Sequence, residues 1–352
     1  MSQHRPSSLS ELARLGFEEL SETIPKLDEL VSLVGDSGHS ALAAVSRAAS
    51  ADRALEGLIR LARHDAKQLA KLLGNQQHAE KLCLILGASD GLADFLFRHP
   101  DQLKVCTEKV ALPKLSDAYS GVTDRSSLRV NYLSQLLRIA LYDLSQLPSV
   151  STVRQVTALL SDLADQTIET AIYIAKSELL SESRVTEQQL DDLDFAVIAM
   201  GKTGARELNY LSDVDVIYVA SGKLDSYLET ATKLATQLAR VLDEPGVEPG
   251  IWQLDPNLRP EGKQGALVRS LEGHRGYYEK WAEPWEFQAL LKARFVAGAQ
   301  ELGEKYIAAI KPLIWSQPNR SAIVESARHL RKRVLDQIPF AEREIEIKLG
   351  RG

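Results

Sequence analysis

Residues 193–220 read LDFAVIAMGKTGARELNYLSDVDVIYVA, and the elements that this stretch predicts decide the fold class. Its first part, 193–200, is a mostly apolar run with the length of a buried strand. A loop with two glycines, Gly201 and Gly204, follows, and residues 214–220 form a second apolar run. We therefore expect two strands joined by a glycine-containing loop, at the centre of a small α/β core.

Helical patterns lie on both sides of this core. Before it, apolar residues recur at three- and four-residue spacing and are interrupted by Gly and Pro. After it the same spacing returns, so residues 272–298 are expected to be helical throughout. The sequence therefore predicts an α+β fold that is mostly helical. Its expected parts are a helical N-terminal module (1–120), long helices leading into the core (121–190), the α/β core (191–270) and a helical C-terminal part ending in a truncated strand or loop (271–352).

Composition limits the classes of function. The chain has 352 residues, 44% of them hydrophobic and 26% charged, which is enough for two or three domains with buried cores. The formal net charge of -6 argues against a broad basic surface for nucleic acid, and so against a template polymerase. No apolar run approaches the roughly 20 residues of a membrane span, and the two cysteines, Cys83 and Cys106, fit a reducing compartment. We expect a cytoplasmic protein that binds neither nucleic acid nor a membrane.

The glycine-containing loop could be a phosphate-binding P-loop. Gly201, Lys202 and Thr203 match the end of the pattern G-x-x-x-x-G-K-[ST], which then requires a glycine at position 196. Residue 196 is alanine, and it lies inside the first expected strand, where the backbone pairs with its neighbours and cannot curl around a phosphate. The P-loop interpretation therefore fails, and Lys202 is left without an assigned role.

The second strand carries two carboxylates that could hold a metal ion. Asp213 and Asp215 lie two residues apart, so both point to the same face of the strand. Adjacent carboxylates repel each other unless a cation neutralises them, and Mg²⁺ is a hard ion that takes carboxylate and phosphate oxygens together. In the alternative interpretation, Asp213 caps a turn and Asp215 is a solvated strand residue.

The order of these elements resembles the nucleotidyltransferase superfamily of the DNA polymerase β type, a mixed-sheet fold. In that superfamily a glycine-rich turn holds the nucleotide phosphates and a later strand supplies a third carboxylate. Asp255 is the only acidic residue in the extended segment expected at 251–260, so the resemblance implies that it completes the set. Three carboxylates of this kind hold two Mg²⁺ ions, which stabilise an in-line phosphoryl transition state.

Three longer motifs make the resemblance more specific. The chain is similar to the nucleotidyltransferase domains of the glutamine synthetase adenylyltransferase/adenylyl-removing family. Those domains carry G-K-x-G-x-x-E-L-x-x-x-S-D-x-D, then D-x-x-L-R-P-x-G-x-x-G-x-L-V, then W-E-x-x-A-L-x-K-A-R. The matching stretches here are MGKTGARELNYLSDVDVI (200–217), LDPNLRPEGKQGALV (254–268) and WEFQALLKARFVAG (285–298).

The resemblance implies a set of residues that bind the nucleotide and its phosphates. Some of them shape the turn at 201–204, which we call the phosphate turn, and others are cations that meet substrate phosphates. One of the last two cations could instead pair with Glu283 or Glu286. The expected residues are Gly201, Gly204, Glu207, Ser212, Arg259, Lys263, Lys292 and Arg294.

The family also implies an activity and its partners. The full-length enzyme has two such domains; the N-terminal copy removes AMP from a tyrosine of glutamine synthetase by phosphorolysis, releasing ADP, and the C-terminal copy attaches AMP from ATP. The helical lead-in after Met1 and the single motif set favour the N-terminal, adenylyl-removing half. The alternating pattern at 344–349, followed directly by the chain end, is expected to be a strand in a fragment of a longer protein.

Two alternatives remain open at this stage. The same site could catalyse adenylylation from ATP, because both reactions use the same three aspartates. The chain could also be a non-catalytic module that binds glutamine synthetase or the PII signal protein, although no motif carboxylate is missing. The PII protein is otherwise expected to act through the full-length enzyme.

Overall fold

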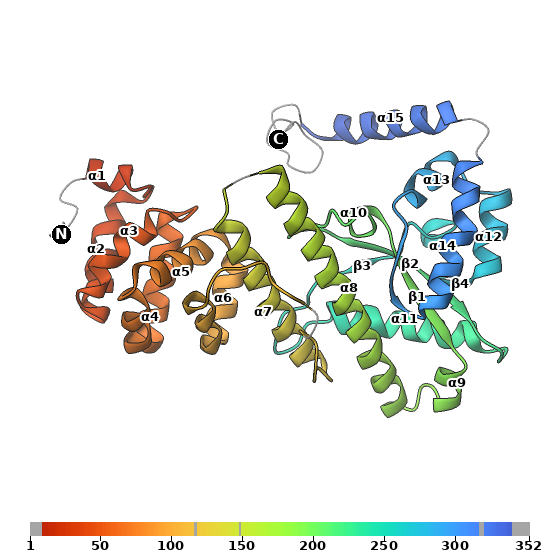
Figure 1. Cartoon of the computed structure of the whole chain (residues 1–352), viewed down its shortest axis with the longest axis horizontal. Helices are drawn as coiled ribbons and strands as arrows, with labels where there is room; N and C mark the ends of the chain where they lie inside the picture. Colours follow the sequence, from red (N-terminus) through yellow and green to blue (C-terminus); the bar gives the residue numbers. More distant parts are fainter. Residues whose placement is uncertain (1–8, 116–117, 148, 317–319, 340–352) are drawn as a thin grey trace. The chain divides into compact units, whose positions relative to one another are not determined.

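The computed structural model describes residues 9–115, 118–147, 149–316 and 320–339, most of which are helical (Figure 1). The chain divides into two compact units. Unit 1 comprises Met1–Ser120 and Val130–Val156, and unit 2 comprises Gly121–Arg129 and Thr157–Gly352. Helices with one small mixed sheet confirm the predicted α+β class. Within the described part of the chain, no helix is long and apolar enough to cross a bilayer.

Unit 1 is built from helices around one core. Ser50, Asn75 and Ser89 begin successive helices by accepting hydrogen bonds from backbone N–H groups of the first turn. The core contains Cys83 and Cys106, which are fully buried free thiols whose pKa values burial raises. The elements are α1 (Leu9–Arg14), α2 (Leu20–Val34), α3 (Ser37–Val45), α4 (Ala51–Leu73), α5 (Gln76–Ala88), α6 (Asp90–Arg98), the 3-10 helix η1 (Pro100–Thr107), most of α7 (Arg125–Leu144) and the start of α8 (Val150–Ser181).

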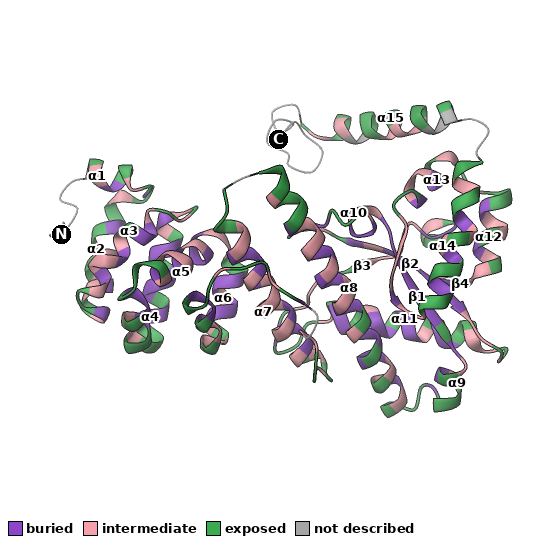
Figure 2. Ribbon diagram, viewed as in Figure 1, coloured by how far each residue is buried: buried purple, intermediate pink, exposed green. Residues whose placement is uncertain are grey.

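Unit 2 contains a five-stranded mixed sheet in the order β3-β2-β1-β5, with β4 also paired to β2. The two apolar runs of the sequence form antiparallel neighbours, β1 (Asp194–Ala199) and β2 (Val214–Ser221). Figure 2 shows both strands buried except near their ends. The remaining strands are β3 (Leu254–Asp255) and β4 (Val268–Ser270), both parallel to β2, and β5 (Arg294–Gly298), antiparallel to β1.

Helices cover the sheet of unit 2. On one face, Ile198 and Ile217 of the sheet pack with Tyr278, Phe287 and Tyr306, which come from three helices, into a buried cluster. The amphipathic α11 contacts β2 and β4. Besides most of α8 and the start of α7, the helices of this unit are α9 (Glu187–Asp191), α10 (Gly201–Gly204), α11 (Tyr227–Asp243), η2 (Gly262–Gln264), α12 (Leu271–Lys280), α13 (Pro284–Leu290), α14 (Gln300–Trp315) and α15 (Arg320–Gln337).

The structure corrects the expected helix at 272–298. The chain leaves α12 at Trp281, and Pro284 starts α13 with a capping box between Glu283 and Glu286. Residues 294–298 then form β5, so Lys292 and Arg294 do not lie on a helix. The extended segment expected at 251–260 contains only the two-residue β3. The strand expected at 344–349 lies outside the described residues.

Candidate active site

Two of the three aspartates are neighbours in the sheet. Asp215 of β2 pairs in register with Asp255 of β3. Residues in register on adjacent strands lie about 4.8 Å apart and point to the same face. Asp213 lies two residues before Asp215, immediately ahead of β2. The Asp255 carboxylate also accepts a hydrogen bond from the backbone N–H of Asn257, at 2.8 Å, which orients it.

The phosphate turn, which is helix α10, lies against Asp215. The backbone N–H of Met200 donates to the carbonyl oxygen of Asp215 at 2.8 Å. Gly201 has a φ of 53°, and a Cβ at this position would overlap Oδ2 of Asp215. At the other end of the turn, a Cβ on Gly204 would overlap the backbone oxygen of Lys292. The two glycines therefore let the turn fit between a carboxylate and a neighbouring chain segment.

Polar side chains connect the phosphate turn to the loops around it. Lys202 Nζ donates to Ser212 Oγ at 3.4 Å, next to Asp213. Lys292 Nζ forms an ion pair with Glu207 Oε2 at 2.9 Å, and both side chains are exposed. Glu283 and Glu286, which the sequence suggests as alternative partners of Lys292 or Arg294, instead form the capping box of α13.

Arg259, which the family resemblance places on substrate phosphates, is hydrogen-bonded to backbone oxygens. It is only 8% exposed and donates to the carbonyls of Pro256, Lys263 and Gly265 at 3.0 to 3.1 Å. It thereby closes the loop that follows Asp255. Lys263 itself lies in η2 with an exposed side chain.

Arg294 has carboxylate and carbonyl partners in the same way. Its guanidinium forms a bidentate ion pair with Asp165 of α8 and donates to the carbonyl oxygens of Thr203 and Gly204. Burial raises the pKa of Asp165 above its ordinary value, and the Arg294 charge offsets part of that shift.

Sequence reasoning missed the polar residues of α8. Ser161 accepts a hydrogen bond from the backbone N–H of Leu208, Asp162 pairs with Arg206, and Glu169 accepts from the N–H of Gly298. Asp165 lies four residues after Ser161, three after Asp162 and four before Glu169, which places these residues on one side of the helix. That spacing is visible in the sequence, but their partners lie 44 to 129 residues away.

The donor chemistry of the three aspartates fits a hard divalent cation, because all their donor atoms are carboxylate oxygens. Asp215 and Asp255 lie side by side, and the turn that abuts Asp215 leaves no room for a side chain at Gly201. Among the residues that the structure describes, no three His, Cys, Asp or Glu side chains are grouped closely enough to hold a metal ion. The fit to a divalent cation therefore rests on the in-register pair Asp215 and Asp255 and on the carboxylate of Asp213.

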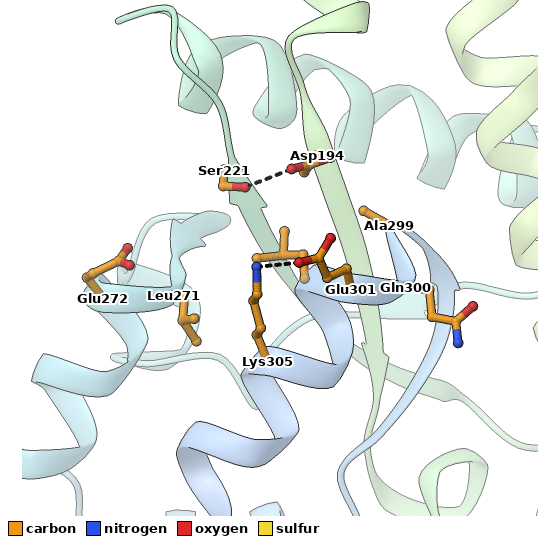
Figure 3. Close-up of a pocket in the computed structure, with 9 residues that line it drawn as sticks. Asp194, Ser221, Leu271, Glu272, Ala299, Gln300, Glu301 and Lys305 are labelled. Carbon is orange, nitrogen blue, oxygen red and sulfur yellow. Dashed lines mark hydrogen bonds and ion pairs between the residues drawn. The ribbon is translucent and has the colours of Figure 1, made fainter.

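A pocket of about 330 Å³ lies at the other end of the same strands (Figure 3). Asp194 starts β1 and pairs in register with Ser221, the last residue of β2, whose Oγ donates to the Asp194 carboxylate at 3.2 Å. Lys305 and Glu301 form an ion pair beside them. Five residues of β1 separate this pocket from the phosphate turn by about 16 Å, so it is distinct from the aspartate site.

Comparison with known proteins gives one family. Residues 79–309 match the model of the glutamate-ammonia ligase adenylyltransferase family. Three similar proteins carry the name bifunctional glutamine synthetase adenylyltransferase/adenylyl-removing enzyme. The one from Leifsonia xyli subsp. xyli is 40% identical over 98% of this chain and 37% of its own length. Those from Streptomyces avermitilis and Streptomyces coelicolor are 40% and 38% identical over 99% of this chain and 35% and 36% of theirs. The chain thus spans about a third of the length of these relatives.

Proposed function

Since the chain belongs to the glutamate-ammonia ligase adenylyltransferase family, we propose that its aspartate site removes AMP from a modified tyrosine of glutamine synthetase by Mg²⁺-dependent phosphorolysis. The observation that carries this proposal is the in-register pair Asp215 and Asp255 beside the phosphate turn. Carboxylates next to a glycine turn suit the transfer of a nucleotidyl group. The products are ADP and unmodified glutamine synthetase.

The reaction balances without a further co-reactant. An oxygen of hydrogen phosphate attacks the phosphorus of the AMP group, and the bond from that phosphorus to the tyrosine oxygen breaks. ADP forms, and the proton of hydrogen phosphate ends on the tyrosine oxygen. Two anions must approach each other in this step, so positive charge is needed around the reacting phosphorus.

Residues of this chain supply binding and orientation. Asp213, Asp215 and Asp255 are the residues that would hold Mg²⁺, which when bound neutralises charge on the reacting phosphoryl group. The phosphate turn fixes the position of the nucleotide, and Ser212 borders it. Lys202 belongs to the turn and Lys292 lies against Gly204 at its end, and both offer ammonium groups to phosphate oxygens. Lys263 is an exposed cation on the loop that follows Asp255.

The direction of the reaction rests on the similarity to adenylyl-removing domains, in which helices precede the nucleotidyltransferase core as unit 1 does here. Adenylylation of glutamine synthetase from ATP is the second candidate, because the names of the relatives state both activities. It would use the same aspartates. A role of the PII protein and a cytoplasmic location stay predictions.

One assay separates the two directions. The chain is incubated with AMP-modified glutamine synthetase, Mg²⁺ and phosphate, and ADP release is measured; the expected result is stoichiometric ADP. Incorporation of AMP from ATP without any ADP release would reverse the assignment. Absence of both activities would favour a binding module.

The metal-site assignment is tested by matched aspartate variants. Asp215→Asn and Asp255→Asn should each lower the rate by about 100-fold or more, because each removes a carboxylate charge at the reacting phosphoryl group. Asp194→Asn changes an aspartate at the opposite end of the same sheet and should leave the rate within about twofold. Full activity of both Asp215→Asn and Asp255→Asn would refute the assignment.

A further inference from the structure

The Arg294 guanidinium is almost completely occupied by protein partners. Nη1 and Nη2 donate to the two carboxylate oxygens of Asp165 at 2.5 and 3.0 Å. Nε donates to the carbonyl oxygen of Gly204 at 3.2 Å, and Nη2 donates to that of Thr203 at 2.9 Å. A guanidinium has five N–H donors, so these contacts leave a single N–H for any other partner.

These hydrogen bonds hold the last two carbonyl groups of the phosphate turn. The first residue of the turn, Gly201, packs against the Asp215 carboxylate with no space for a Cβ. Because the turn has only four residues, a displacement at Thr203 and Gly204 also displaces Gly201. The separation between the turn and Asp215 therefore depends on the position of Arg294.

Asp165 takes its position from a long helix. It lies in α8, between Asp162, which pairs with Arg206, and Glu169, which binds the N–H of Gly298. One face of α8 thus holds the chain just after the phosphate turn and the strand β5 that carries Arg294. Figure 1 shows α8 running beside α10 and the sheet. The ion pair is partly buried, with side-chain exposures of 25% and 17%, so solvent competes weakly for it.

We propose that Arg294 and Asp165 are positioning residues that hold the phosphate turn against Asp215, and that Arg294 does not bind substrate phosphate. The kinetic part of this inference rests on the proposed function. The structural part does not, because the hydrogen bonds that hold the phosphate turn are formed within the chain itself.

Hydrogen exchange tests the structural part without nucleotide or metal. Asp165→Asn and Arg294→Gln should each speed amide exchange in the peptide 201–208 by tenfold or more, while the peptide 214–221 from β2 keeps the wild-type rate. Arg294→Lys should behave like Arg294→Gln, because one ammonium cannot bridge a carboxylate and two carbonyls. Unchanged exchange at 201–208 in all three variants would overturn the proposal.

Kinetics on the full chain tests the role in the reaction. We expect Asp165→Asn and Arg294→Gln to lower kcat by similar factors, roughly 10- to 100-fold, with the KM for phosphate within about twofold. The double variant should be no slower than the slower single variant, because both substitutions break the same ion pair. Arg275→Gln, which breaks an exposed ion pair with Glu279, is the control for loss of an arginine.

A different pattern would identify Arg294 as a phosphate ligand. In that case Arg294→Gln raises the KM for phosphate, and Asp165→Asn has little effect. Failure of the proposed function can be told apart from failure of this inference. In that case the wild-type chain releases no ADP, but the variants still speed amide exchange at 201–208.

Discussion

Gly201 brings the backbone of the phosphate turn against the Asp215 carboxylate, and it does so with a positive φ of 53°. Gly201→Ala should therefore abolish at least 99% of the activity, because the new Cβ displaces either the turn or Asp215 by about 1 Å. ADP release from AMP-modified glutamine synthetase is the measurement. Gly35→Ala is the matched control, since Gly35 also has a positive φ of 66° but a Cβ there meets nothing within 4 Å. Equal loss of activity in both variants would contradict the prediction.

Lys202 is the cation that the sequence left without a role. Its ammonium contacts Ser212, and no ion pair with a carboxylate is found for it in the described ranges. Arg259 and Arg294, by contrast, donate three and four hydrogen bonds to protein oxygens. Lys202→Ala should accordingly raise the KM for phosphate by about tenfold, the effect of losing one charge-assisted hydrogen bond.

The control for Lys202→Ala is Lys305→Ala, which removes an exposed lysine at the other end of the sheet. It should leave the KM for phosphate unchanged. A wild-type KM in the Lys202→Ala variant would remove Lys202 from the proposed site.

His274 should make the stability of unit 2 depend on pH. Burial lowers its pKa to about 4, and its Nε2 donates to the carbonyl of Tyr218 at 3.2 Å. Since the unfolded chain binds the proton near pH 6.5 and the folded chain does not, stability falls as the pH drops below that value. We expect a loss of about 2 kcal/mol between pH 7 and pH 5 from this residue.

Urea unfolding of the wild type and of His274→Phe at both pH values measures this term. The variant should lose less stability on acidification than the wild type. An identical pH dependence of the two proteins would show that the His274 proton does not contribute.

Among the elements, local sequence predicted β1 and β2 but not β5. The runs at 193–200 and 214–220 are apolar over a strand length, and both form strands. Residues 294–298 follow a helical pattern in sequence, and they become extended because the free edge of β1 is available for pairing. Gly298, with φ 88°, approaches the backbone of Phe195 too closely for any Cβ. A local sequence pattern does not predict such long-range strand pairing.

In the candidate site, too, local sequence suggests some features and long-range pairing determines others. The types and spacing of Asp213, Asp215 and Gly201 suggested the chemistry, and their assignment as site residues stays a prediction. The alignment of Asp255 with Asp215 depends on the register between β2 and β3. The family resemblance implied that Arg259 and Arg294 bind phosphate, and that role stays a prediction. Their hydrogen bonds to protein oxygens depend on loop geometry, which the sequence alone does not give.

The end of α11 depends on a residue from the start of α7. Arg129 is 2% exposed and donates to the carbonyl oxygens of Val241, Glu244 and Glu248. Arg129→Ala should lower the free energy of unfolding of unit 2 by about 2–4 kcal/mol, because it removes a buried hydrogen-bond donor from three carbonyls. Arg240→Ala removes an exposed pair with Glu244 and should cost under about 1 kcal/mol. Similar urea midpoints for the two variants would refute this.

Among the described residues, unit 1 and the sheet of unit 2 each have a buried hydrophobic cluster of their own. Leu58 is fully buried in unit 1, and Ile198 is fully buried in the sheet cluster of unit 2. Truncating either one to alanine should cost about 2–5 kcal/mol. We expect Leu58→Ala to speed amide exchange in α4 and α5 more than in β1 and β2, and Ile198→Ala to do the reverse. Equal effects on both units would indicate one cooperative structure.

The two cysteines can report the opening of the hydrophobic core of unit 1. Cys83 and Cys106 are the only thiols in the chain, and both lie in the core of unit 1. A thiol reagent can reach them only when that core opens, and the aspartate site in unit 2 has no cysteine to react. The rate of labelling therefore measures the opening of unit 1 in the unmodified protein, even while glutamine synthetase or a nucleotide is present.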